Sequence, residues 1–221
     1  MKIQLNILSD YYEDGGLIYP LEDTRARKVH HKTLRDMDST IRLCKKKRVA
    51  IQAGGNCGIW ARKMCQIFDS VYTWEPDPIN FVALAVNTAR CRNLIKFQAA
   101  LGNKSKYVGM SHQMYGKIPN TLNCGATYVE GSGIIPTMKI DDLNLPYCDL
   151  IYLDIEGYEL FALEGSKETI AKHRPVIACE DKELSERYNV KQGDLVNYLT
   201  NMFNYSLAGT VRKDVIMVPP K

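Results

Sequence analysis

Residues 49–58 read VAIQAGGNCG, an apolar run that leads directly into three glycines. The run has the composition of a buried strand, and the apolar spacing from Trp60 onward indicates a helix immediately after it. Glycines at such a strand-to-helix turn let a ligand lie against the main chain, and the start of the helix offers unpaired amide donors. A dinucleotide fingerprint would need glycines where the chain has Asn56 and Ile59. The turn therefore predicts a nucleotide-like ligand without a phosphate-cradling loop, with a purely structural turn as the alternative.

Similar apolar runs recur along the chain, and stretches of helical period separate them. This alternation is typical of an α/β fold with a mostly parallel sheet and helices on both faces. With 221 residues, 45% of them hydrophobic, the chain is long enough for one core and short for two. We expect strands at 49–52, 71–74, 95–98, 150–154, 176–179 and 215–218.

Three apolar stripes at helical spacing are expected to pack into the core. They are Trp60, Met64, Ile67 and Phe68; Ile79, Val82, Ala83, Val86 and Ala89; and Leu195, Leu199, Met202 and Phe203.

Two segments fall outside this alternation. Residues 1–48 begin with alternating Ile3, Leu5 and Ile7 and continue with polar residues, which predicts a strand followed by a cover segment before the main domain at 49–221. Residues 103–146 are irregular, with weak strand character at 126–129 and 137–140. Because long connections at the functional edge of a sheet often form lids, we expect 103–146 to be an insertion or lid of the same domain that carries part of the substrate site.

Glu75 ends the second predicted strand, about 20 residues after the glycine turn, and Pro76 follows it. A carboxylate at this position can accept hydrogen bonds from both ribose hydroxyls of an adenosine. The alternative is an acid that interacts with the start of the next helix, a role that Asp77 fills more naturally. We therefore predict that Glu75 binds the ribose.

The third predicted strand leads into small residues, among them Ala100 and Leu101. Such residues leave a flat slot for an adenine ring, with a backbone donor near Ala100 for the ring edge. Simple packing at the end of a strand explains them equally well.

Acidic side chains follow the next two strands. Asp154 and Glu156 come after the fourth run, and Glu180 and Asp181 after the fifth. Ligands of open parallel sheets bind beyond the carboxyl ends of the strands, so these acids are expected to face the ligand cleft. They can orient a hydroxyl, withdraw its proton or hold a divalent cation, and their residue types leave these roles open, so a divalent metal is possible but not predicted. Helix capping is the structural alternative.

In combination these signals resemble the FkbM family of S-adenosylmethionine-dependent methyltransferases, over roughly residues 49–180. The motifs that carry the resemblance are Gly54-Gly55-Asn56-Cys57-Gly58, Glu75-Pro76, Ala100-Leu101-Gly102, Ile140-Asp141-Asp142-Leu143 and, most specifically, Asp154-Ile155-Glu156-Gly157-Tyr158-Glu159. The resemblance implies a Rossmann-like, class I methyltransferase domain over 49–221 with a seven-stranded sheet. It also implies S-adenosylmethionine as cofactor and O-methylation of a hydroxyl on a sugar or other small metabolite. The chain departs from the family at Gln52, where an acid is common, and at Tyr152, where a lysine is frequent.

The predicted site combines both lines of reasoning. The base candidates are Asp154 and then Glu180, with Glu156 beside them, whereas His173 is expected to end a helix on the opposite side of the sheet. His30, His31 and His112 lie in segments of unassigned structure. The cofactor-binding residues are predicted to be Gln52, Gly54, Gly55, Asn56, Gly58, Glu75, Pro76, Ala100, Leu101 and Asp154.

Composition limits the remaining possibilities. The net charge of +4 permits a nucleic-acid partner without requiring one. The seven cysteines are dispersed and form no close pairs, which favours reduced thiols in a cytoplasmic protein. No signal peptide and no apolar run of about 20 residues is apparent, so we expect no membrane partner.

Two alternative functions stay open at this point. The basic run Lys45–Arg48 is compatible with a nucleic-acid methyltransferase acting on a ribose 2′-hydroxyl, or with a solvated lead-in to the first strand. Gln52 would fit a cofactor-binding module without catalysis.

Overall fold

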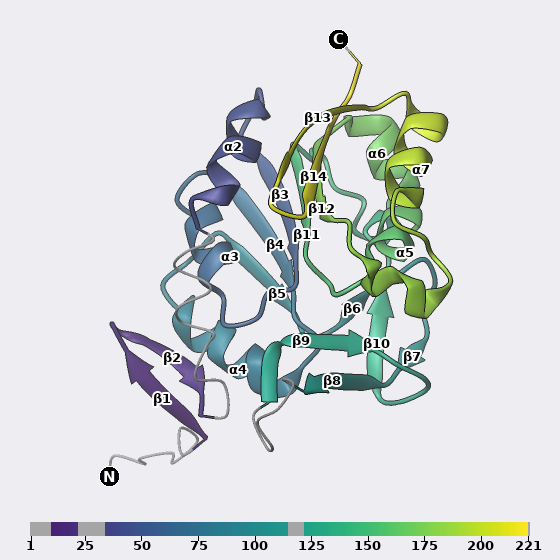
Figure 1. Cartoon of the computed structure of the whole chain (residues 1–221). Helices are drawn as coiled ribbons and strands as arrows, with labels where there is room; N and C mark the ends of the chain where they lie inside the picture. Colours follow the sequence, from purple (N-terminus) through teal and green to yellow (C-terminus); the bar gives the residue numbers. More distant parts are fainter. Residues whose placement is uncertain (1–9, 22–33, 115–121, 221) are drawn as a thin grey trace.

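The computed structural model describes residues 10–21, 34–114 and 122–220. Its main sheet has seven strands in the order β13-β14-β12-β11-β3-β4-β5 (Figure 1). All six predicted strands are confirmed within two residues, whereas β13, an edge strand without an apolar run, was not predicted. The bounds are β3 Val49–Ala53, β4 Ser70–Trp74, β5 Leu94–Phe97, β11 Leu150–Leu153, β12 Val176–Glu180, β13 Ser206–Val211 and β14 Asp214–Val218.

The sheet is mostly parallel, as expected. Strands β12, β11, β3, β4 and β5 pair in parallel with their neighbours, and β14 is antiparallel to both β12 and β13. From β3 the chain proceeds outward through β4 to β5, and it then returns to β11 on the other side of β3. The strand order therefore reverses between β3 and β11, the point at which doubly wound sheets bind their ligands.

Helices cover both faces of the sheet, as predicted (Figure 1). Ala50 and Tyr152 belong to a core cluster with α2 and α3, whereas their neighbours Ile51 and Ile151 belong to a cluster with α5, α6 and α7. Strands buried on both faces read as continuous apolar runs because successive side chains enter opposite cores. The helices are α2 Asp36–Leu43, α3 Ile59–Met64, α4 Pro78–Asn87, α5 Glu159–Glu164, α6 Lys167–His173 and α7 Asp194–Phe203, with 3-10 turns η1 Asp141–Leu143 and η2 Glu183–Tyr188.

The predicted buried stripe of α4 is wrong. Ile79 and Val86 are 43% and 46% exposed, and Ala89 is exposed as well. The helix instead buries Asn80 and Leu84, together with Ala83. The buried face of α4 is set by a tertiary contact, because Leu84 packs directly against the glycine turn after β3.

The stripes of α3 and α7 are largely correct. Met64 and Phe68 are buried, as are Leu195 and Leu199. Met202 is the exception, since it is 60% exposed near the end of α7.

Small sheets occupy the segment that was expected to form a lid. Strand β10 (Ile135–Met138) pairs with β6 (Ala100–Leu101) and β7 (Tyr107–Val108), and β8 (Met110–Met114) pairs antiparallel with β9 (Leu122–Val129). The weak strand signals at 126–129 and 137–140 thus correspond to β9 and, in part, to β10.

The β8–β9 pair lies along the carboxyl edge of the main sheet. His112 Nε2 on β8 is 3.6 Å from Asp77 Oδ2, just after β4, and the hydroxyl of Tyr188 in η2, after β12, donates to the carbonyl of Val129 on β9 at 2.7 Å. In Figure 1 these strands run beneath the sheet. The insertion therefore lies at the carboxyl edge of the main sheet.

The N-terminal part adds a hairpin and one helix. Strands β1 (Tyr11–Asp14) and β2 (Leu17–Pro20) pair antiparallel. The side-chain amide of Asn87 in α4 accepts from the backbone N–H of Ile18 in β2 and donates to its carbonyl. The expected strand at Ile3, Leu5 and Ile7 lies outside the described residues. Within the described ranges, every helix is too short or too polar to cross a bilayer.

Candidate functional site

The glycine turn after β3 is built for close approach. Gly54 has a φ of +80°, and a β-carbon there would lie 1.9 Å from the carbonyl oxygen of Asp154. Gly58 has a φ of +81° and precedes α3, where a β-carbon would meet Thr88 at 2.9 Å. Gly54 lets the loops after β3 and β11 meet at the reversal point of the sheet, and Gly58 lets α4 pack against the same turn, while Gly54 and Asn56 stay partly accessible.

Gln52 supports this turn from inside the core. Its side chain is fully buried, and its amide nitrogen donates to the carbonyl of Gly54 at 2.8 Å. Its carbonyl oxygen accepts from the hydroxyl of Thr73 at 2.5 Å. An ionised carboxylate could not donate to Gly54, so the amide of Gln52 has a structural role here, supporting the turn from its buried side.

Glu75 closes the other side of the turn. It is 4% exposed, and its two carboxylate oxygens accept from the backbone amides of Asn56 at 2.6 Å and Asp77 at 2.9 Å. Burial raises the pKa of Glu75 to about 8, and these hydrogen bonds oppose the shift. Asp77 caps α4 by accepting from Ile79 and Asn80, so the capping role belongs to Asp77, as argued from the sequence.

The small residues predicted to form the adenine slot are packed. Ala100 and Leu101 are 5% and 1% exposed, and they form β6, which pairs with Thr137 and Met138 of β10. Pro76 is partly exposed beside Glu75. The packing alternative therefore describes Ala100 and Leu101, which leaves only main-chain atoms of this strand for a ligand.

Three of the predicted acids meet at the carboxyl edge. One carboxylate oxygen from each of Asp154, Glu156 and Glu180 lies within 4.8 Å of the others. Burial raises the pKa of Asp154, and raises that of Glu156 to about 7 with a further contribution from the charge of Asp154. The Lys182 ammonium contacts Glu180 and opposes both shifts.

The predicted acids differ in their hydrogen-bond partners. The first turn of α5 has no side-chain cap from Asp154 or Glu156; instead Glu159, 2% exposed, accepts from the amide of Ile155 at 2.8 Å. Asp181 turns away from the cluster and accepts from the amide of Gly193. The capping alternative therefore describes Asp181, which accepts from the amide at the start of α7, whereas neither Asp154 nor Glu156 caps α5.

The buried Glu159 makes the stability of the fold depend on pH. Burial raises its pKa to about 8, so the folded protein holds a proton that the unfolded chain releases above about pH 4.5. The free energy of unfolding is expected to fall as pH rises from about 5 to about 8, by about 1 kcal/mol or more from this group. Urea titrations at several pH values would measure the slope, which should be shallower in Glu159→Gln. A slope unchanged in that variant would contradict the assignment.

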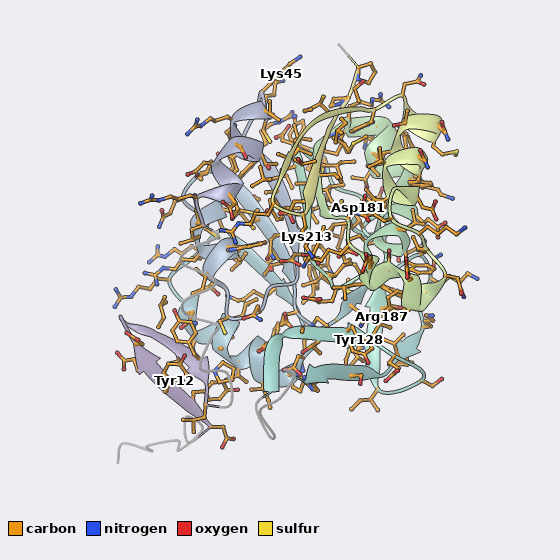
Figure 2. The ribbon with its side chains drawn as sticks, in the orientation of Figure 1. Tyr12, Lys45, Tyr128, Asp181, Arg187 and Lys213 are labelled. Carbon is orange, nitrogen blue, oxygen red and sulfur yellow. The ribbon has the colours of Figure 1, made fainter. Side chains whose placement is uncertain are left out.

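An aromatic hollow adjoins the acidic cluster, and the sequence analysis missed it. Its volume is about 690 Å³, and Arg187 stacks over the ring of Tyr128 at 3.8 Å along its wall (Figure 2). Arg187 also lowers the pKa of Glu156 through its charge, which connects the hollow with the acids. The available signal was the presence of single tyrosines such as Tyr128 and Tyr158 in and after the insertion. The lining is Lys106, Val108, Tyr128, Val129, Glu130, Gly131, Tyr158, Phe161, Arg187 and Tyr188.

The two described histidines lie in different parts of the fold. His173 ends α6, and its Nε2 lies 3.0 Å from the carbonyl of Leu145, so the expected helix end is confirmed. His112 lies at the carboxyl edge beside Asp77, a placement that the sequence did not predict. His30 and His31 lie outside the described residues.

Comparison with solved structures supports the fold. The chain is similar to methyltransferase FkbM from Methylobacillus flagellatus KT, with 20% identity and a TM-score of 0.48 over 78% of this chain and 43% of that one. It therefore spans less than half the length of that protein. It is also similar to precorrin-6y C5,15-methyltransferase from Geobacter metallireducens GS-15, with 13% identity and a TM-score of 0.50 over 93% of each chain. The second of these likenesses, with a TM-score of 0.50, supports a Rossmann-like fold for this chain.

Comparison of sequences identifies the family. No curated protein matches this sequence significantly. The family model of the methyltransferase FkbM domain, however, matches residues 54–207, well over half of the chain. That range starts at the glycine turn and includes Glu75, the acidic cluster and the aromatic hollow. The chain therefore belongs to the FkbM methyltransferase family.

Proposed function

We propose that this protein uses S-adenosylmethionine to methylate a hydroxyl of a sugar or other small metabolite. The observation that carries the proposal is the juxtaposition of the glycine turn, Glu75 and Asp154 at the reversal point of the sheet. Membership of the FkbM family supports methyl transfer as the reaction.

The residues of this edge fit an adenosine-containing cofactor. Glu75 accepts hydrogen bonds from two backbone amides and from the Asn80 side chain, and a carboxylate has about four acceptor positions, so it retains capacity for a ribose hydroxyl. Gly54 and Asn56 are accessible beside it, and Gln52 holds the turn from behind. In this arrangement Gly54, Gly55, Asn56 and Gly58 form the turn against which the cofactor lies, and Gln52 acts on the cofactor only through that turn.

The aromatic hollow is our candidate acceptor site. The rings of Tyr158, Phe161 and Tyr188 pack edge or face on one another, with centroids 4.6–6.0 Å apart. Aromatic rings and a nearby arginine suit a polyhydroxylated ring, which offers an apolar face and many hydrogen-bonding groups. Six of the ten residues that line the hollow come from 106–131, which supports the substrate role expected for the insertion.

Methyl transfer to a hydroxyl requires mainly that the protein position the acceptor and provide one proton acceptor. When bound, the cofactor supplies a methyl group on a sulfonium, which is transferred by in-line displacement. The hollow would hold the acceptor oxygen behind that methyl group and exclude water. Asp154, whose pKa burial raises, is the proposed base for the hydroxyl proton, with Glu180 as the second candidate.

A screen of hydroxylated sugars, metabolites and short RNAs for transfer from labelled cofactor tests the proposal. Once an acceptor is found, Asp154→Asn should lower turnover by about 100-fold or more, because a positioned base contributes on that order. Asp142→Asn, at an exposed acid paired with Lys139, is the matched control. Undiminished turnover in Asp154→Asn would remove this residue as the base.

The basic run Lys45–Arg48, which suggested a nucleic-acid methyltransferase acting on a ribose 2′-hydroxyl, lies away from the proposed acceptor site. Arg48 pairs with Asp149 at 2.6 Å, and Lys47 donates to the carbonyls of Ile41 and Cys44. This basic run precedes β3, and Figure 2 shows Lys45 at the end of the molecule opposite Tyr128 and Arg187. It therefore lies at the amino edge of the sheet, away from the proposed acceptor site.

A further inference from the structure

The cluster of Asp154, Glu156 and Glu180 includes a buried acceptor without a hydrogen-bond partner. Glu180 is 8% exposed, and its Oε2 is buried without a hydrogen-bond partner, whereas its Oε1 contacts the Lys182 ammonium. A buried carboxylate oxygen without a partner is costly. Its position among two further carboxylates indicates that a positively charged group belongs there.

The charge balance points the same way. Three carboxylates lie close together, and Lys182 is the cation that contacts them directly among the described residues, with Arg187 acting on Glu156 from a distance. The negative charges exceed the positive ones even with both cations counted. Like charges at this separation repel strongly in a partly buried site.

The spacing of the oxygens suits a divalent cation. Ligands on opposite sides of a Mg²⁺ or Ca²⁺ ion, at about 2.1–2.4 Å each, lie about 4.2–4.8 Å apart. The three carboxylate oxygens here all lie within 4.8 Å of one another. Oxygen-only donors favour Mg²⁺, Mn²⁺ or Ca²⁺ over zinc or copper.

We propose that Asp154, Glu156 and Glu180 bind one divalent cation at the carboxyl edge of the sheet, next to the aromatic hollow. Three protein ligands leave about three positions of an octahedral ion open. Two adjacent oxygens of an acceptor can fill two of them, so the substrate class is a vicinal diol or a hydroxyl beside a second oxygen.

The role of this cation, though not its binding, rests on the proposed function. A bound divalent ion orients the acceptor and increases the acidity of its hydroxyl. A carboxylate that ligates through one oxygen keeps its other oxygen, so Asp154 can still accept the hydroxyl proton. Lys182 competes for Glu180 when no metal is bound, and its side chain, 25% exposed, can move out to solvent.

Binding of Mn²⁺ alone, followed by loss of the free-ion signal in electron paramagnetic resonance, tests the site without any acceptor. Wild-type protein should bind one Mn²⁺, and Glu180→Gln should bind it at least about 100-fold more weakly, since even partners outside the coordination sphere contribute 10–100-fold. Glu183→Gln, at an exposed acid three residues on, should bind as the wild type does. Lys182→Met should bind about tenfold more tightly, because a competing charge is removed.

A second variant and a second ligand keep the outcomes distinct. If Glu180→Gln does not fold, Glu156→Gln replaces a less buried ligand and should show the same weakening. No Mn²⁺ binding by wild type, or equal binding by the ligand variants and Glu183→Gln, would overturn the metal site. Binding by Lys182→Met alone would also overturn it, because the lysine would then be the resident cation. Calorimetry with S-adenosylmethionine in the absence of metal separates this result from failure of the proposed function.

Discussion

Glu75→Ala is expected to weaken binding of S-adenosylmethionine at least about 100-fold, or about 2.8 kcal/mol. The variant removes the acceptors proposed for the ribose, and it leaves the amides of Asn56 and Asp77 without their partner in a buried place. Calorimetry with S-adenosylmethionine and S-adenosylhomocysteine measures the effect. Glu168→Ala, at an exposed acid in α6, is the matched control and should bind normally.

A double-mutant cycle separates the ribose contact from support of the turn. Glu75→Gln keeps the shape of the side chain, and a 2′-deoxy analogue of S-adenosylhomocysteine lacks one hydroxyl. If Glu75 contacts that hydroxyl, the two changes should be less than additive in binding free energy. Full additivity, or normal cofactor binding by a folded Glu75→Ala protein, would refute the ribose assignment.

Gly54→Ala is expected to have the largest effect on stability, lowering the free energy of unfolding by about 3 kcal/mol or more. A left-handed backbone costs alanine about 1 kcal/mol, and the overlap of the new β-carbon with the Asp154 carbonyl oxygen adds the larger part. Relief of the overlap would separate the loops after β3 and β11, so cofactor binding should also be lost. Chemical denaturation and calorimetry measure the two effects.

Gly193 provides the control for backbone strain alone. Its φ is +92°, and a β-carbon there has nothing within 4 Å. Gly193→Ala should therefore lose only about 1 kcal/mol and keep full cofactor affinity. Equal losses in Gly54→Ala and Gly193→Ala would show that the approach of Asp154 contributes nothing.

Glu75 and Ala100 show how far residue types can predict a site. Glu75 lies at the predicted strand end because strand length and the spacing from the glycines are local properties of the chain. The sequence explained Ala100 equally well by an adenine slot or by simple packing. Its burial in β6 against β10 depends on residues more than 30 positions away. The buried face of α4 was mispredicted for a similar reason, because Leu84 packs on a turn that belongs to another element.

The acidic residues show the same division. Their positions after two parallel strands predict that they share an edge, since parallel strands present their carboxyl ends together. Whether each acid faces the cleft or caps a helix depends on side-chain direction, which separates Asp181 from Glu180 although they are neighbours in the chain.

By itself the sequence determined the α/β class, six strands of the main sheet, the glycine turn and the family, because each follows from local periodicity or from short motifs at strand ends. Only the tertiary structure decided that Gln52 supports the turn from behind, that Tyr128 and Arg187 line a hollow beside Glu156, and that Glu180 has an oxygen without a partner. These features depend on contacts between residues far apart in the chain, and no local pattern encodes which distant side chains will meet.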